Sequence, residues 1–329
     1  MRRIRRLKGS SREVIHKPTG ASNAEAQTTV KPPMKNLISR RRFLLHSTAV
    51  CAMSALPDRL IGATNEPPEA RLDFPLMDLH VHLDNSTIEK VLELPAARTV
   101  KFGIVEHAGT KENKYPVVLS NDAELKARNA MLEGKPVFKG IQTEWTDWMG
   151  CFSPEALAQL DFVLTDAMTF PGKDGQRVKL WEPRVEERVE MRDKQEFMDR
   201  YVDWHVAILS KQPIDILANV SWLPAPLAGD YDAFWTPARM QEVIDAAVKF
   251  RVAIEISSSF RLPRLPFLRA AKAAGAKFCF GSNGRYPAMG KLDYSVQMAK
   301  ELALTHSDIF VPAPDGQKAV QRRFPAKRS

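Results

Sequence analysis

The chain has 329 residues, of which 44% are hydrophobic and 26% charged, values that exclude collagen-like, coiled-coil and wholly disordered proteins. No run of about 18 apolar residues exists, which excludes an ordinary transmembrane helix. The net charge of +9 comes from residues 1–63, which hold 13 basic and three acidic groups. The rest of the chain holds 35 basic and 36 acidic groups and is therefore close to neutral. A nucleic-acid-binding domain needs a basic face on its folded body, so we expect no nucleic-acid partner.

Residues 34–65 have the pattern of an export signal. Three arginines precede Phe-Leu-Leu at 43–45, and the uncharged stretch that follows ends in small residues. Such a series is typical of secretory signals, and the arginines before Phe-Leu resemble the twin-arginine type. We expect export to the periplasm or extracellular space through the twin-arginine machinery, with no stable membrane anchor. Residues 1–33 are polar and predicted to be a disordered or non-native extension, with Met34 as the initiator.

Strand-length apolar runs alternate with helical patterns along the remaining chain. The predicted strands lie at 76–83, 102–105, 137–142, 162–165, 214–218, 252–256 and 277–280. The predicted helices lie at 88–94, 122–132, 155–160, 195–209, 237–250, 265–274 and 294–304. Seven βα units predict one α/β domain over 66–312, closed or nearly closed into a barrel, with an open doubly wound sheet as the alternative. The basic tail at 313–329 is expected to be a solvated terminus.

Polar residues follow the strands where a barrel carries its functional groups. His80 and His82 share one face of the first strand, because residues at i and i+2 do so, and they can reach one ion. His107 and Glu144 end the next two strands, and Asp166 adds a carboxylate after the fourth. Imidazole suits Zn, Mn and Fe, so these five residues are the predicted ligands of a divalent metal.

The strand motifs resemble the PHP (polymerase and histidinol phosphatase) superfamily, and more narrowly an exported bacterial group within it. The matching segments include Asp-Leu-His-Val-His-Leu, Ile-Val-Glu-His, Gly-Ile-Gln-x-Glu and Phe-Gly-Ser-Asn, in order between about Leu76 and Tyr286. The resemblance implies a distorted, TIM-like (β/α)7 barrel, metal ions at the strand ends and phosphoester hydrolysis. By position it carries over four ligands: His80, His82, His107 and Glu144. Other residues replace the remaining ligands, which favours one or two ions: Met168, Asn219, Asn283 and Arg285.

The predicted activity is hydrolysis of a phosphoester or another anionic small molecule by metal-activated water. Asp166 or Glu106 is expected to transfer the proton. Arg285 is predicted to bind the anionic substrate, with a salt bridge to a rim carboxylate such as Glu255 as the alternative. Further substrate-binding residues are predicted: Asn283, Asn219, Glu255 and Trp145. An amidohydrolase-type C–O or C–N hydrolase and a non-catalytic metal- or ligand-binding barrel remain open as alternatives.

Overall fold

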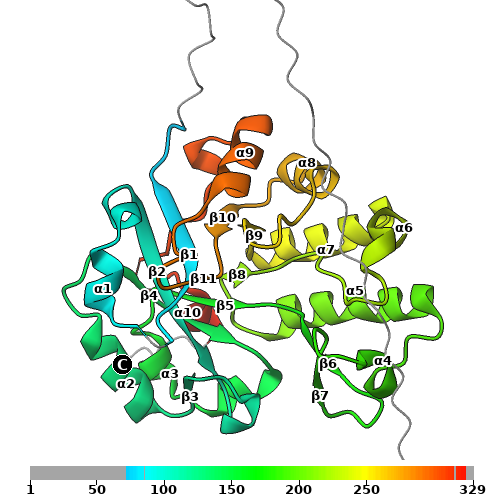
Figure 1. Cartoon of the computed structure of the whole chain (residues 1–329), viewed down its shortest axis with the longest axis horizontal. Coiled ribbons are helices and arrows are strands. Elements are labelled where there is room, and N and C mark those ends of the chain that lie inside the picture. The colour runs from blue at the N-terminus through cyan, green and yellow to red at the C-terminus, as the bar shows by residue number, and fades with distance from the viewer. Residues whose placement is uncertain (1–71, 85, 315, 324–329) are drawn as a thin grey trace, which may run out of the picture. The chain divides into compact units, whose positions relative to one another are not determined.

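A computed structural model describes residues 72–84, 86–314 and 316–323, so the predictions for residues 1–33 and 34–65 lie outside the described residues. All seven predicted strands are present (Figure 1): β1 (Leu76–His82), β2 (Val100–Ala108), β4 (Phe138–Thr143), β5 (Phe162–Thr165), β8 (Ile216–Leu217), β9 (Ala253–Ser257) and β10 (Phe278–Gly281). They are parallel and lie in the order β10-β9-β8-β5-β4-β2-β1, with the short β11 (Gly284–Arg285) paired to β1. The result is a nearly closed, eight-stranded parallel barrel with a seam, consistent with the predicted distorted TIM-like fold.

The predicted helices also form: α1 (Ile88–Leu92), α2 (Asp122–Met131), α3 (Pro154–Leu157), α5 (Lys194–Lys211), α7 (Pro237–Phe250), α8 (Leu265–Ala273) and α9 (Asp293–Glu301). Five of them begin at a side chain that accepts a backbone N–H, which stabilises the first turn. These N-cap residues are Thr87, Asn121, Ser153, Asp193 and Thr236. Within the described ranges, no helix is both long and apolar enough to cross a membrane.

Several short elements were not predicted. They are β3 (Val118–Leu119), the β6 (Thr169–Pro171)–β7 (Arg177–Lys179) hairpin, α4 (Val185–Arg188), α6 (Tyr231–Phe234) and α10 (Ala319–Arg323). Single 3₁₀ turns lie at Pro95–Arg98, Lys111–Asn113, Thr146–Gly150, Ala228–Asp230 and His306–Asp308. Elements of two to five residues carry too few side chains to show a periodic pattern, which explains why the sequence did not reveal them.

Part of the basic tail packs on the barrel. Ala319 and Val320 of α10 are buried, and the Ala319 N–H donates a hydrogen bond to Asp215 at 2.9 Å. The Lys318 ammonium donates to the Ala158 carbonyl at 3.1 Å. The expectation of a solvated terminus is therefore wrong for this stretch, because Ala319 and Val320 are buried where α10 contacts β5 and α3.

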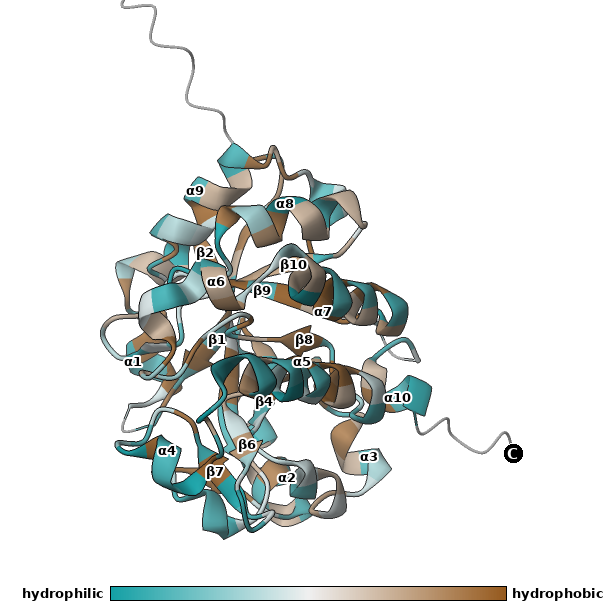
Figure 2. Ribbon diagram, turned by 90° about the vertical axis from the view of Figure 1, so that its right-hand side faces the viewer, coloured by the Kyte–Doolittle hydropathy of each residue, from teal (hydrophilic) through white to brown (hydrophobic). Residues whose placement is uncertain are grey.

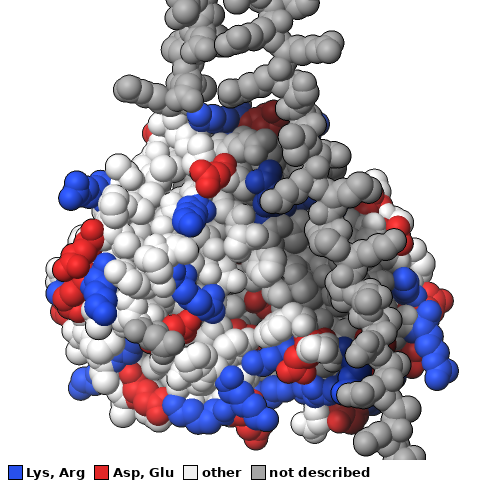
Figure 3. Space-filling view, in the orientation of Figure 1, with Lys and Arg blue, Asp and Glu red and all other residues white. Residues whose placement is uncertain are grey.

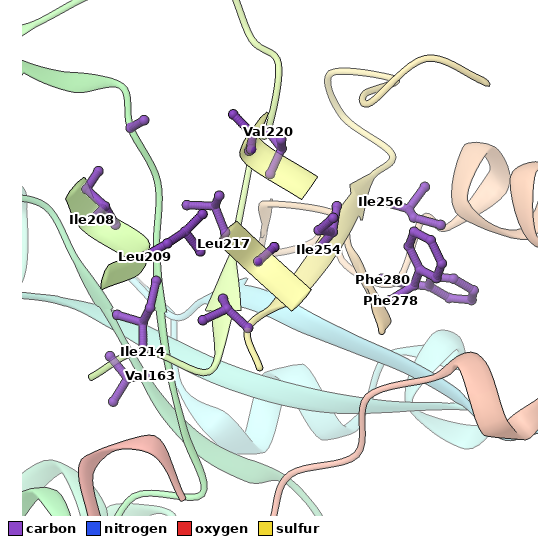
Figure 4. Packing of buried hydrophobic residues seen from close by; sticks show 14 of the residues in the cluster. Val163, Ile208, Leu209, Ile214, Leu217, Val220, Ile254, Ile256, Phe278 and Phe280 are labelled. Carbon is purple, nitrogen blue, oxygen red and sulfur yellow. The ribbon is translucent and has the colours of Figure 1, made fainter. Parts of the chain in front are cut away.

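Two apolar layers hold the fold together. The barrel interior is filled from six strands by Met77, Leu79, Val105, Phe162, Leu164, Ile216, Ala218, Ala253 and Cys279. A Cβ on Gly140 would lie 2.4 Å from the Phe162 ring, so glycine at this strand position makes room for that ring. Outside the barrel, helices cover the strands with their apolar faces, as the two-coloured helices of Figure 2 show. Figure 4 shows this outer layer, in which Ile208 and Leu209 of α5 pack near strand residues such as Leu217.

The surface of the barrel domain mixes charges of both signs. Figure 3 shows basic and acidic side chains interspersed on one face, with no large area of a single sign. Exposed ion pairs account for part of this pattern, for example Arg188 with Glu182 at 2.8 Å and Arg264 with Asp232 at 3.2 Å. Pairs as exposed as these contribute little to stability.

A carboxylate closes the seam between β10 and β1. Asp78 of β1 is fully buried and accepts hydrogen bonds from the Ser282 N–H at 2.9 Å, the Ser282 hydroxyl, and the Gly290 N–H at 3.0 Å. Burial raises the pKa of Asp78 to about 6, although these donors act in the opposite direction. Asp78 thus ties β1 to the chain that follows β10, next to the two-residue backbone ladder between β1 and β11.

Candidate functional site

A pocket of about 320 Å³ opens at the carboxyl ends of the strands. Its polar lining includes six residues that the sequence analysis singled out: His107, Glu144, Asp166, Asn219, Asn283 and Arg285. Four aromatic side chains also line it, namely Tyr115, Trp181, Trp222 and Phe260. The predicted convergence of polar strand ends on one pocket is therefore present.

A closed ring of hydrogen bonds joins five strands beneath this pocket. Glu255 Oε1 lies 2.7 Å from His80 Nδ1, and His80 Nε2 lies 2.9 Å from Gln142 Oε1. The carboxylate of Asp166 accepts from the amides of Gln142 at 3.4 Å and Asn219 at 3.1 Å. The Asn219 N–H donates to Glu255 Oε2 at 2.9 Å and completes the ring. A Cβ on Gly281 would lie 1.8 Å from Glu255 Oε1, so glycine at this end of β10 leaves space for the ring.

His80 is committed to this ring. Both of its nitrogens face oxygens, an arrangement that a doubly protonated imidazolium satisfies with two donated hydrogen bonds. Burial is the largest single influence and lowers the pKa of His80, but Glu255, Gln142 and Asp166 together outweigh it, so the pKa is raised. Both ring nitrogens of His80 are thus engaged in hydrogen bonds, so a metal ion at His80 would have to replace one of these partners, and the ligand role of His80 stays a prediction.

Glu144 and His107 also satisfy each other. His107 Nδ1 lies 2.7 Å from Glu144 Oε1, and the Tyr115 hydroxyl donates to Glu144 Oε2 at 2.9 Å. The Tyr115 ring stacks on His107 with centroids 3.5 Å apart. The predicted ligand Glu144 therefore holds His107 in place, and only Nε2 of His107 lacks a partner among the described residues.

Asp166 lies in the pocket beside Glu144. It is buried, and its carboxylate accepts the Met168 N–H at 2.9 Å as well as the two ring amides. Burial and the nearby charge of Glu144 raise the pKa of Asp166 to about 7. A carboxyl group that titrates near neutral pH can both accept and donate a proton, which suits the predicted proton-transfer role.

The group best suited to a metal ion is His82, Asp84 and Glu106. Each offers a ligand atom within 4.8 Å of the other two. Among the described residues, no hydrogen bond of ordinary geometry reaches either ring nitrogen of His82, Oδ1 of Asp84 or Oε2 of Glu106, although these atoms are buried. Leaving such atoms without partners costs about 1–3 kcal/mol each. One imidazole and two carboxylates form a donor set that Zn, Mn and Fe accept, so these residues fit a divalent ion.

Burial shapes the protonation of this group. It lowers the pKa of His82 well below the usual range, with the neighbouring His80 and His107 adding to the effect. The ring is therefore neutral and keeps a lone pair. Burial raises the pKa of Glu106 to about 7, while Arg128 opposes the shift. Asp84 and Glu106 also line a second pocket of about 470 Å³ beside α2, which gives the group a route to solvent.

Arg285 links this group to the first pocket. Its Nε donates to Asp84 Oδ2 at 2.6 Å, and its Nη1 donates to the carbonyl and the side-chain oxygen of Asn283, both at 3.1 Å. The sequence analysis kept open a salt bridge between Arg285 and a rim carboxylate, with Glu255 as the example. The ion pair exists, but its partner is Asp84, because Glu255 is fully buried against His80.

Three of these residues adopt left-handed backbone conformations directly after their strands. The φ angles are 44° for Asp84, 51° for Asn219 and 47° for Asn283. Asp and Asn tolerate this region better than other side chains do. The tight turns bring polar side chains back over the barrel end, which explains why short polar residues occupy these positions.

Two predicted substrate-binding residues lie outside the pocket lining. Glu255 belongs to the buried ring, and Trp145 packs against Trp204 with centroids 5.3 Å apart. The sequence analysis in turn gave no role to Gln142 and Tyr115. Gln142 of β4 lies two residues before Glu144, which directly follows that strand, and this spacing could have revealed it.

Comparison with known proteins adds no assignment to this geometry: no protein-family model and no curated protein matches the chain.

Proposed function

We propose that the protein is a metal-dependent hydrolase of a small molecule that carries an oxyanion, in a divergent PHP-like barrel. One observation carries the proposal: buried atoms that could bind a metal, and that have no hydrogen-bond partner among the described residues, lie close together on His82, Asp84 and Glu106 beside a polar pocket. The resemblance in sequence favoured His80, His107 and Glu144 as ligands, but hydrogen bonds engage these residues elsewhere. We therefore propose that the site binds one divalent metal ion.

A divalent ion in this group would lower the pKa of bound water and polarise a substrate oxygen. The other tasks belong to side chains of the pocket. Arg285 presents a positive charge for an anionic group of the substrate, which is either a phosphoester or a carboxylate. Asp166, with its pKa of about 7, holds or releases a proton at its carboxylate near neutral pH. Trp181, Trp222 and Phe260 supply apolar surface for the rest of the substrate.

Elemental analysis tests the proposal most directly. Protein purified without a chelating resin should contain about one equivalent of Zn, Mn or Fe, and the Asp84→Asn/Glu106→Gln double variant should lose it. A matched control is Asp174→Asn/Glu187→Gln, which changes two exposed carboxylates and should keep the metal. A folded wild-type protein that stays metal-free after reconstitution would refute the proposed site.

Turnover of a substrate panel then separates the reaction classes. Phosphomonoester hydrolysis supports the phosphoesterase reading, whereas hydrolysis of lactones or amides supports the amidohydrolase-type alternative. The hydrogen-bond ring around His80 favours one further candidate function, because it occupies a residue that the resemblance assigns to the metal. This candidate is a barrel that binds a metal and a ligand without catalysing a reaction. Bound metal with no turnover of any panel member would support that candidate.

We also propose that residues 34–65 direct export through the twin-arginine pathway, supported by the arginines at 40–42 before Phe-Leu. Replacing these three arginines by lysine should keep the protein in the cytoplasm. Cell fractionation followed by detection of the protein in each fraction measures this. Unchanged export of the variant would contradict the proposal.

A further inference from the structure

We propose that Asp84 couples two binding sites, so that a divalent cation at His82, Asp84 and Glu106 and an oxyanion at Arg285 strengthen each other's binding. This inference rests on the proposed function and adds the anion subsite and its dependence on the cation. The subsite takes a single oxyanion group, either a carboxylate or a phosphoryl group.

The two oxygens of Asp84 serve different neighbours. Oδ2 accepts the Nε–H of Arg285 at 2.6 Å. Oδ1 is buried and accepts no hydrogen bond from any residue that the structure describes. Asp84 also contributes to the group of ligand atoms within 4.8 Å of one another on His82 and Glu106. One carboxylate therefore belongs both to the cation site and to the ion pair with Arg285.

Arg285 has donors left for a ligand. A guanidinium carries five N–H groups. Nε is used by Asp84, and Nη1 is used by the two oxygens of Asn283. Within the described part of the chain, Nη2 makes no hydrogen bond, and the side chain is 45% exposed at the pocket. Because Nε and Nη1 are engaged, a ligand meets the two N–H groups of Nη2, which suits one oxyanion group.

The charges explain why the two ligands depend on each other. Without a cation, the carboxylate of Asp84 neutralises Arg285, and Glu144 and Asp166 line the same pocket, so an anion meets little net attraction. A divalent cation on Asp84 offsets that carboxylate and leaves the charge of Arg285 available. The guanidinium of Arg285 and the cation compete for the carboxylate of Asp84. An oxyanion bound to Arg285 offsets the charge of the guanidinium, so the cation binds Asp84 more strongly. Such coupling is reciprocal by thermodynamic necessity and typically amounts to 5–150-fold.

Calorimetric titrations of the full wild-type protein test the coupling, with Mn²⁺ as the cation and methylphosphonate or acetate as the oxyanion. We expect a saturating oxyanion to strengthen Mn²⁺ binding roughly tenfold, and Mn²⁺ to strengthen oxyanion binding by the same factor. Coupling with methylphosphonate identifies a phosphoryl ligand, and coupling with acetate a carboxylate. Mn²⁺ binding that neither oxyanion changes would overturn this inference and leave the metal site intact, whereas absent Mn²⁺ binding would overturn the proposed function.

The Arg285→Gln variant distinguishes coupling through Asp84 from direct contact between the two ligands. It removes the competitor for Asp84, so Mn²⁺ should bind more tightly than in the wild type when no oxyanion is present, and the coupling should disappear. Arg269→Gln is the matched control, since Arg269 forms an exposed ion pair with Glu301 at 2.9 Å, and both affinities should stay unchanged. Undiminished coupling in Arg285→Gln would show that the oxyanion contacts the cation directly and would refute the role of Asp84.

Discussion

His80 and His82 lie two residues apart on β1, and both are fully buried, yet their replacement by phenylalanine should change stability in opposite directions. In a chelator, neither nitrogen of His82 has a hydrogen-bond partner in the described structure, and its neutral ring stacks on His107 at 4.7 Å. Phenylalanine keeps an aromatic ring there and removes the unpaired polar atoms. We expect His82→Phe to stabilise the protein by about 1–2 kcal/mol, since an unsatisfied buried group costs about 1–3 kcal/mol.

The matched change His80→Phe should destabilise the protein. It would leave the buried carboxylate of Glu255 without its cationic partner and Gln142 without its donor. Removing one member of a buried ion pair costs about 3–5 kcal/mol. The opposite signs follow from hydrogen bonding alone, because the two histidines share strand, burial and residue type.

Urea denaturation in a chelator measures both free energies of unfolding. In a second series with Mn²⁺, the free energy of unfolding of the wild-type protein should rise, because ligands that bind only the folded state raise stability by mass action. The free energy of unfolding of the His82→Phe variant should not change. Equal destabilisation by the two substitutions in a chelator would refute the assignment of His82 as the unsatisfied member of the pair.

Three further substitutions test the site and the fold. Gly281→Ala should cost about 2–4 kcal/mol in urea denaturation, because its Cβ would lie 1.8 Å from Glu255 Oε1, whereas Gly150→Ala meets no atom within 4 Å and should be close to neutral. Burial lowers the pKa of His205 from 6.5 to about 4, so the unfolded chain binds a proton at a higher pH than the folded protein does. As the pH falls from 6.5 to 4, the free energy of unfolding should therefore decrease by up to about 1.4 kcal/mol per pH unit. His205→Phe should flatten that slope, and an unchanged slope would contradict the assignment. Asp78→Ala should cost about 3–5 kcal/mol by leaving the donors across the seam unpaired, and a loss below about 1 kcal/mol would show that the seam closes without this carboxylate.

The strands and the position of the pocket could be predicted from the sequence because they depend on local patterns. Apolar runs of four to eight residues marked each buried strand, and the polar residues after them, such as Asp166 and Asn219, line one pocket. In a parallel barrel every strand ends on the same side, so the residues that follow each apolar run could be assigned to the same end of the barrel.

The partners of the two histidines could not be predicted in the same way. His80 is engaged by Gln142 and Glu255, which lie 62 and 175 residues further along the chain. No local pattern reports which of His80 and His82 meets those side chains, since both lie on the same strand and both are buried. Asp84 was likewise absent from the predicted ligands, because no local pattern shows that this residue, with its left-handed backbone, lies close to Glu106.

The seam has a consequence for how the chain folds. The carboxylate of Asp78 and the N–H of Ser282 are separated by 204 residues, so the first and last barrel strands can join only when almost the whole domain has been synthesised. Contacts of such long sequence separation form slowly, because the loop entropy must be lost before the contact stabilises anything. The edge of β1 that faces β10 is therefore a surface that the nascent chain leaves unpaired until the end of the domain has been synthesised.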